Sequence, residues 1–137
     1  MEQLELAKEI LTKSETIAVV GLSPREDSPS HYVAKYLIKQ GYRVFPVNPK
    51  YSTVLGIQGS ATLTSLAKSV KVDVVNIFRH PADIPPIVEE AIKIQAPYVW
   101  MQEGIVNHQA KEMAERNGIQ VVMDRCMMKS HKSLIKE

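Results

Sequence analysis

The amino-acid sequence predicts an α/β fold: a Rossmann-like, doubly wound sheet of five mainly parallel strands with helices on both faces. Three observations support this prediction. Short apolar runs rich in β-branched residues recur along the chain, segments with helical periodicity separate them, and glycines and prolines mark the boundaries. With 137 residues, of which 45% are hydrophobic and 23% charged, we expect a single domain over 1–137.

Five segments predict strands, and their apolar character is nearly continuous rather than alternating. Continuous hydrophobicity is typical of parallel strands that helices cover on both faces. The segments are 17–20, 44–47, 72–78, 98–101 and 119–123.

Helical periodicity precedes the first strand, through Leu4, Ala7, Ile10 and Leu11, and follows the first, third and fourth strands. The segment 51–70 fits a loop followed by a short helix at 64–68. The alternation of strands and helices with right-handed crossovers favours the strand order 3-2-1-4-5. In that order the loop after the first strand faces the loop after the fourth.

Residues typical of helix starts and helix ends support these helix boundaries. Ser28 is a candidate N-cap for a helix whose first residue is Pro29, and Gly41 and Gly118 stand where left-handed helix ends are expected.

Composition excludes several classes of function. Seventeen basic and fifteen acidic residues give a net charge of +2, too balanced for a protein that coats nucleic acid but compatible with a small anionic ligand. One cysteine and four scattered histidines predict neither a disulfide nor a metal site. Because the sequence has no membrane-spanning run and no secretory signal pattern, we expect a cytoplasmic protein without a membrane partner. The sequence identifies no protein partner.

The loop after the first strand is a candidate phosphate-binding segment. It begins with a glycine at the strand end and leads into a helix start, whose free N–H groups attract anions. It lacks the further glycines of the dinucleotide fingerprint, which argues against classical NAD binding. The alternative is that Gly21 only makes a turn and the serines only cap. The candidate ligand contacts are Gly21, Leu22, Ser23, Pro24, Ser28 and Ser30.

The ends of the second and third strands add candidate contacts. Asn48, Pro49 and Lys50 follow the second strand, where an NAD enzyme places an acidic residue, so Lys50 favours a nucleotide with an extra phosphate. Phe78 can stack on adenine and Arg79 can bind phosphate. The alternatives are a solvated Lys50 and a Phe78 that belongs to the core.

The end of the fourth strand completes the predicted site. Gln102, Glu103 and Gly104 are expected to contact the middle of an elongated ligand, whereas Trp100 is expected in the core. Cys126 follows the fifth strand and is expected to be partly buried and unreactive. His108 and His131 are expected on the surface. The basic, mildly amphipathic segment 127–136 is expected to be a solvated tail; the alternatives are that it covers the sheet edge, contacts a partner or attracts the phosphates of the ligand.

The strand ends together carry a resemblance: "VVGLS", "PVNPK", "NIFRHP", "VWMQEGIVN" and "VVMDRC". From about Thr16 to Cys126 the chain resembles small stand-alone CoA-binding domain proteins, similar to the N-terminal CoA-binding domain of the succinyl-CoA synthetase alpha subunit. The resemblance implies coenzyme A or an acyl-CoA as ligand, held by the loop 21–30, Lys50 and the turn 102–104. The synthetase loop is rich in glycine, and this loop is not.

The resemblance implies binding without catalysis, because the active-site histidine of the synthetase lies in a second domain and this chain ends at Glu137. We therefore expect a non-catalytic CoA-binding module. Two alternatives remain open: an NADP-linked oxidoreductase, and a regulatory interaction protein with a vestigial nucleotide pocket. Cys126 also has an alternative role, a reversible mixed disulfide with the CoA thiol.

Overall fold

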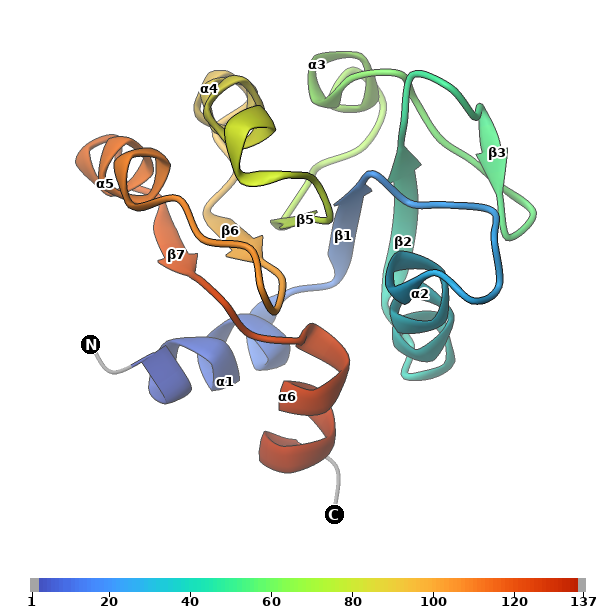
Figure 1. Cartoon of the computed structure of the whole chain (residues 1–137), viewed down its shortest axis with the longest axis horizontal. Helices are drawn as coiled ribbons and strands as arrows, with labels where there is room; N and C mark the ends of the chain where they lie inside the picture. Colours follow the sequence, from blue (N-terminus) through green and yellow to red (C-terminus); the bar gives the residue numbers. More distant parts are fainter. Residues whose placement is uncertain (1–2, 136–137) are drawn as a thin grey trace.

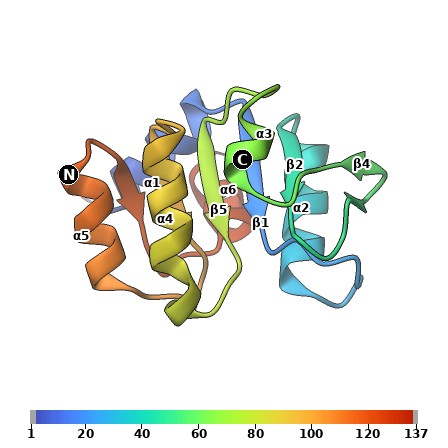
Figure 2. The ribbon, with the colours of Figure 1, turned by 90° about the horizontal axis from the view of Figure 1, so that it is seen from above.

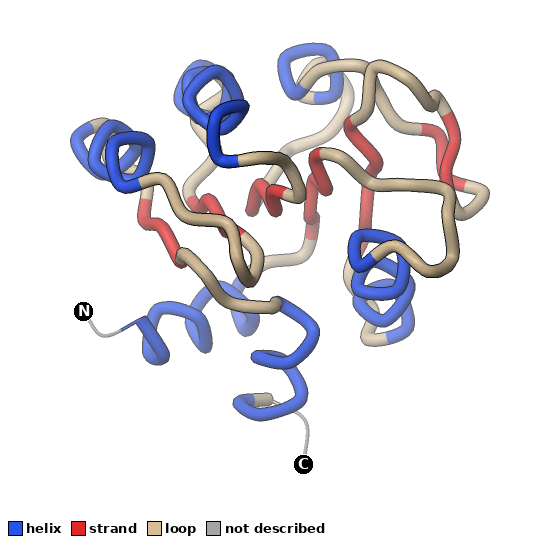
Figure 3. The backbone as a smooth tube through the Cα atoms, in the orientation of Figure 1, coloured by secondary structure: helices blue, strands red, loops and turns tan. Residues whose placement is uncertain are grey.

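The computed structural model describes residues 3–135 as one α/β unit (Figure 1 and Figure 3). The strands are β1 (Thr16–Val20), β2 (Arg43–Val47), β3 (Thr53–Val54), β4 (Ile57–Gln58), β5 (Val74–Ile77), β6 (Tyr98–Met101) and β7 (Gln120–Val122). The helices are α1 (Gln3–Lys13), α2 (Pro29–Lys39), α3 (Leu63–Leu66), the 3₁₀ turn η1 (Pro81–Asp83), α4 (Ile84–Lys93), α5 (His108–Arg116) and α6 (Met127–Leu134).

The main sheet has five parallel strands in the order β2-β1-β5-β6-β7, which confirms the predicted fold class. The predicted strand order, 3-2-1-4-5, is wrong, because the third predicted strand lies beside the first and not beyond the second. All four residues of β5 are buried, as a position between two strands requires. The order in which the chain adds strands to the sheet therefore reverses between β1 and β5, although these two strands are parallel.

Pro46 gives the physical reason for the position of β2. An inner strand forms hydrogen bonds with a neighbour on each side. Proline has no N–H group to donate to such a neighbour, so within sheets it occurs mainly in edge strands. The Pro46 carbonyl faces outward and accepts a hydrogen bond from the backbone N–H of Ser60. The antiparallel β3–β4 hairpin, which was not predicted from the sequence, brings this segment alongside β2.

Helices cover both faces of the sheet (Figure 2). The right-handed crossover from β1 to β2 runs in the opposite direction across the sheet from the later crossovers, so its helix lies on the opposite face. One core cluster lies under α3, α4 and α5, and the other lies under α1, α2 and α6. Trp100 is fully buried in the second cluster, as predicted, and its indole Nε1 donates to the Arg125 carbonyl at 2.8 Å.

The helix boundaries agree with most of the sequence signals. α2 begins at Pro29 after Ser28, and Gly41 and Gly118 both have a positive φ. Ser28 does not cap through its side chain within the described chain; its hydroxyl bonds to that of Ser30 instead. In α1 the predicted apolar face is buried except for Leu4, which is 50% exposed.

The basic segment after β7 is a helix and not a solvated tail. α6 buries Met127, Ser130 and His131, so the prediction of a surface His131 is wrong. The segment packs because its apolar and small residues recur on one face, against α1 and α2. His108 is exposed, as predicted.

The outer edge of β7 is covered by a side chain. The Gln3 carboxamide donates from Nε2 to the Val121 carbonyl at 3.1 Å, and its Oε1 accepts from the Met123 N–H at 3.1 Å. One residue of α1 thus satisfies a donor and an acceptor of the edge strand, as a neighbouring strand would do.

Candidate functional site

A cleft of about 610 Å³ opens at the carboxyl ends of β1, β5 and β6. Ligands of doubly wound sheets bind at this edge, where the strand order reverses. The walls come from the loop after β1, the first turn of α2, the loops after β5 and β6, and the first turn of α6. The lining residues are Gly21, Ser28, Pro29, Ser30, Tyr32, Val33, Phe78, Arg79, His80, Pro81, Gln102, Glu103, Gly104, Ile105, Cys126, Met128 and Lys129.

Gly21 makes the tight connection between β1 and the cleft. Its φ is +90°, and its N–H donates to the Val47 carbonyl at 2.9 Å. A Cβ at this position would lie 2.5 Å from the Phe78 carbonyl oxygen. A glycine is therefore required by the close approach of the β5 end, and it also leaves backbone open to the cleft.

The serines of this loop hold its shape. Ser30 is buried, and its Oγ accepts from the Ser23 N–H at 2.9 Å and lies 3.1 Å from Ser28 Oγ. The His31 ring, also buried, bonds through Nδ1 to the Ser23 carbonyl at 3.0 Å. Ser28 and Ser30 line the cleft, whereas Leu22 belongs to the core. Ser23 and Pro24 lie outside the lining that the described residues form.

The end of β2 lies beside the cleft and not in it. Asn48 donates from Nδ2 to the Leu22 carbonyl at 3.1 Å, and its Oδ1 accepts from the Lys50 N–H at 2.9 Å. The exposed Lys50 side chain places Nζ 5.7 Å from the Tyr51 ring centroid. Within residues 3–135, Asn48, Pro49 and Lys50 contribute nothing to the cleft lining.

The end of β5 supplies an aromatic face and a cation. Phe78 is half-buried, packs against the α1, α2 and α6 side of the core, and lines the cleft. Arg79 lies beside it, 42% exposed, with one guanidinium nitrogen 3.3 Å from Asp83 Oδ2. His80 also lines the cleft, although no pattern in the sequence distinguished it from an ordinary loop residue.

The loop after β6 joins the cleft to α6. Gln102 is buried, and its Oε1 accepts from the Met127 N–H at 2.9 Å, so its carboxamide caps α6. Glu103 is 3.0 Å from Lys129 Nζ and raises the pKa of that lysine through a hydrogen bond and its charge. The Gly104 N–H donates to Asp124 Oδ1 at 2.7 Å.

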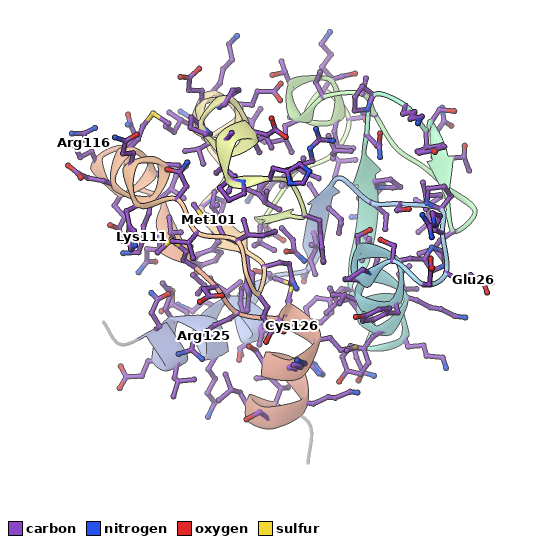
Figure 4. All side chains as sticks on the ribbon, in the orientation of Figure 1. Glu26, Met101, Lys111, Arg116, Arg125 and Cys126 are labelled. Atoms are coloured by element: carbon purple, nitrogen blue, oxygen red, sulfur yellow. The ribbon has the colours of Figure 1, made fainter. Side chains whose placement is uncertain are left out.

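The first turn of α6 forms a wall of the cleft, which the sequence suggested only as an alternative to a solvated tail. Cys126 lies at the N-terminal end of this helix, beside the loop after β6 (Figure 4). It is 8% exposed, in agreement with the expected partial burial. Met128 and Lys129 also line the cleft, and Tyr32 faces it from α2. The basic, amphipathic pattern of 127–136 was the signal that could have identified this wall.

Among the described residues, no cluster of three His, Cys, Asp or Glu side chains is arranged to hold a metal ion. In the same part of the chain, no helix has both the length and the apolar character needed to cross a membrane. Arg79 and Lys129 are the cationic side chains of the cleft lining, against the single carboxylate of Glu103. Together with the α2 N-terminus, this composition favours an anionic ligand.

Solved structures show the same fold across nearly the whole chain. A hypothetical protein from Pyrococcus horikoshii OT3 matches with a TM-score of 0.92 and 38% identity, covering 98% of this chain and 93% of that chain. The cell-free ID.343 protein from Thermus thermophilus matches with a TM-score of 0.90 and 36% identity, covering 98% of this chain and 100% of that chain.

Sequence comparison identifies the family. Protein YneT of Bacillus subtilis (strain 168) is 40% identical over 124 residues, which are 90% of each chain. Acetate–CoA ligase [ADP-forming] I of Archaeoglobus fulgidus is 27% identical over 122 residues, which are 81% of this chain and 17% of the ligase. The family described as "CoA binding domain" matches residues 15–132. The match confirms the resemblance at the strand ends, and the chain belongs to the CoA binding domain family.

Proposed function

We propose that this protein is a non-catalytic, single-domain cytoplasmic module that binds coenzyme A or an acyl-CoA in the cleft at the carboxyl ends of β1, β5 and β6. One observation carries the proposal. In a chain of the CoA binding domain family, the cleft at the reversal of the strand order brings together a helix N-terminus, two hydroxyls and Arg79. These groups suit a pyrophosphate.

The α2 N-terminus supports the pyrophosphate position. Its first turn contributes Pro29, which has no N–H group, followed by Ser30, and both line the cleft. Ser28 supplies a second hydroxyl at the same place. A phosphate there accepts hydrogen bonds from the hydroxyls, and the partial positive charge of the helix end favours it, although the His31 and Tyr32 N–H groups already donate to the Ser28 carbonyl.

Lys50 is proposed to contact the 3′-phosphate. It follows β2, the strand next to β1, and is exposed just outside the cleft. An elongated ligand with its pyrophosphate at Ser28 and Arg79 can extend its adenosine end past Phe78 toward β2. Its pantetheine arm then runs toward the turn 102–104, which lines the cleft and in which only the Gln102 Oε1 is bonded to Met127.

Calorimetric titration with CoA tests the phosphate contact of Arg79. We expect Arg79→Gln to weaken CoA binding about 10-fold to 100-fold, since a hydrogen bond to a charged group contributes roughly 1.5–3 kcal/mol. Arg116→Gln is the matched control, because Arg116 also pairs with an acid four residues away, on the outer side of α5 (Figure 4). Equal affinities of the two variants would contradict the placement.

Thermal unfolding with several nucleotides tests the ligand itself. A ligand at about a hundred times its dissociation constant adds roughly 2.7 kcal/mol to the free energy of unfolding. We expect CoA to stabilise the protein more than 3′-dephospho-CoA, NADP or NAD, and Lys50→Gln to remove the difference between the first two. Lys111→Gln, on α5, is the control. Absent stabilisation by CoA, or a larger effect of NADP, would overturn the proposed function.

A further inference from the structure

A second groove lies beside the cleft, between the start of α1 and α6. These two helices pack against each other on one face of the sheet (Figure 1). The groove has a volume of about 280 Å³, and its lining includes Leu4 of α1 and Ser133 and Leu134 of α6. Three residues line both the groove and the cleft, and they form a shared wall: Glu103, Cys126 and Lys129.

The shared wall is closed by an ion pair that separates easily. Lys129 Nζ lies 3.0 Å from Glu103 Oε1, and the two side chains are 67% and 58% exposed. An ion pair with this exposure contributes little to stability, because water screens both charges. Separating the two side chains therefore costs little, and a chain that passes between them reaches the groove from the cleft.

The chemistry of the groove suits an uncharged, apolar chain. Leu4 is 50% exposed, whereas the other two leucines of α1 are buried, and Leu134 of α6 is half-buried in the same groove. A chain that covers these two leucines removes apolar surface from water, which favours binding. The charged residues of the lining are two acids and two bases, so their charges cancel: Glu103, Asp124, Arg125 and Lys129.

The size and position of the groove indicate that its occupant is part of the ligand in the cleft. Separate ligand pockets have volumes of about 300–1,000 Å³, and the groove is smaller than this range. The pantetheine arm of the proposed ligand runs toward the turn 102–104, and Glu103 of this turn belongs to the shared wall. The sulfur end of the ligand then lies at the wall, so an acyl group on that sulfur is next to the groove.

We propose that the groove between α1 and α6 binds the acyl group of an acyl-CoA, and that the protein prefers the thioester of an uncharged, straight-chain fatty acid to free CoA. This inference rests on the proposed function, which places the pantetheine arm. The Glu103–Lys129 ion pair separates as the chain enters. Each methylene group that the groove removes from water strengthens binding by up to about fourfold, so affinity grows with chain length until the groove is filled.

Calorimetric titration with CoA, butyryl-CoA, octanoyl-CoA and succinyl-CoA tests the preference. We expect octanoyl-CoA to bind at least about tenfold more tightly than CoA, with butyryl-CoA between them. Succinyl-CoA has the chain length of butyryl-CoA and a terminal carboxylate, so it is expected to bind less tightly than butyryl-CoA.

The outcomes of this titration separate the inference from the proposed function. Equal affinities for CoA and octanoyl-CoA would overturn the inference and leave the proposed function standing. Tighter binding of succinyl-CoA than of butyryl-CoA would overturn the choice of an uncharged chain. If none of the four compounds binds, the proposed function fails, and this inference fails with it.

Ser133→Trp tests whether the chain lies in the groove. Ser133 is exposed and lines the groove but not the cleft, so an indole at this position fills the groove and spares the cleft. We expect the affinity for octanoyl-CoA to fall to that for CoA, and the affinity for CoA to stay unchanged. Ser65→Trp is the matched control, because Ser65 is exposed on α3, on the opposite face of the sheet. A preference for octanoyl-CoA that survives Ser133→Trp would contradict the placement.

Leu4→Gln tests the same groove without adding bulk. The exposed Leu4 side chain contributes little to the core, so the variant is expected to fold and to bind CoA as the wild type does. Its affinity for octanoyl-CoA is expected to fall several-fold, because the chain loses an apolar contact. Val106→Gln replaces an exposed apolar residue that lines neither space and should bind octanoyl-CoA as the wild type does. An unchanged affinity of Leu4→Gln for octanoyl-CoA would overturn the acyl site.

Discussion

Gly21 has two roles: it allows close packing against the end of β5, and it lines the cleft. Its φ is +90°, and a Cβ on its backbone would lie 2.5 Å from the Phe78 carbonyl oxygen, so no side chain fits. The glycine was identified from the sequence through its expected contact with phosphate. The neighbour that makes it indispensable comes from β5, which is distant along the chain and was predicted on the wrong side of β2.

Gly21→Ala is expected to destabilise the protein more than Gly41→Ala. Both positions have a positive φ, which costs roughly 1–2 kcal/mol for a residue with a side chain. At Gly41 a Cβ would meet no described atom within 4 Å, whereas at Gly21 it would displace the β5 end. We expect an additional loss of at least about 1 kcal/mol for Gly21→Ala in denaturant unfolding. Equal losses would show that the close contact relaxes without cost.

Gln102 has a structural role that the sequence could not reveal, because hydrogen bonds to distant backbone leave no local pattern. Its Oε1 accepts the first N–H of α6, and the residue also lines the cleft, where its contact with the ligand stays a prediction. Trp100, by contrast, was predictable, since a large aromatic inside an apolar strand is usually buried.

At the scale of elements, Gln102 connects the loop after β6 to α6. Gln102→Ala leaves the Met127 N–H without its acceptor in a buried place, which costs about 1–3 kcal/mol. We expect this loss in the free energy of unfolding without ligand, together with faster hydrogen exchange in α6. Gln109→Ala, exposed on α5, is the control and should change neither quantity. A Gln102→Ala variant that lost only ligand affinity would show that Gln102 contacts the ligand and does not stabilise α6.

The strands were predicted to within about two residues at each end, because hydrophobic runs are a local property of the sequence. The order of the strands in the sheet was not predicted correctly, because it depends on which strands pair with a neighbouring strand on both sides. Pro46 could have indicated the correct order, since a proline in the second strand favours an edge position for that strand. The β3–β4 hairpin escaped prediction because two-residue strands carry too little pattern.

At the scale of the whole molecule, the site was only partly predictable. Ser28, Ser30, Phe78, Arg79 and the turn 102–104 converge because parallel strands share one carboxyl edge. Lys50 lies outside the cleft, since β2 is the outermost strand on that side. The contribution of α6 depends on how the chain folds back after β7; the amphipathic pattern of 127–136 indicates a packed helix but not its position beside the cleft.

Alkaline pH is expected to destabilise the whole fold in part through Tyr42. Burial, and then Tyr36, raise its pKa above the unfolded value near 10. The folded state therefore keeps a proton that the unfolded state loses, so this stability is complete below pH 10 and falls as the pH rises through the folded pKa. The slope is at most about 1.4 kcal/mol per pH unit for one proton.

Denaturant unfolding between pH 9 and 11 measures this contribution. Tyr42→Phe is expected to lower stability at pH 9, because its hydroxyl bonds to the Leu11 carbonyl, and to reduce the slope above pH 10. Tyr51→Phe, an exposed tyrosine, should keep the wild-type slope. An unchanged slope in Tyr42→Phe would assign the alkaline loss to other groups.

The Gln3 carboxamide has a consequence for handling the protein. It alternates donor and acceptor against Val121 and Met123 as a sixth strand would, so shortening this side chain uncovers a ready template for intermolecular pairing. Gln3→Ala should leave the folded monomer largely intact and yet make concentrated solutions prone to aggregation. The solubility of the stored protein would then depend on the Gln3 carboxamide. An affinity tag joined at the amino end therefore needs a spacer that leaves this side chain in place.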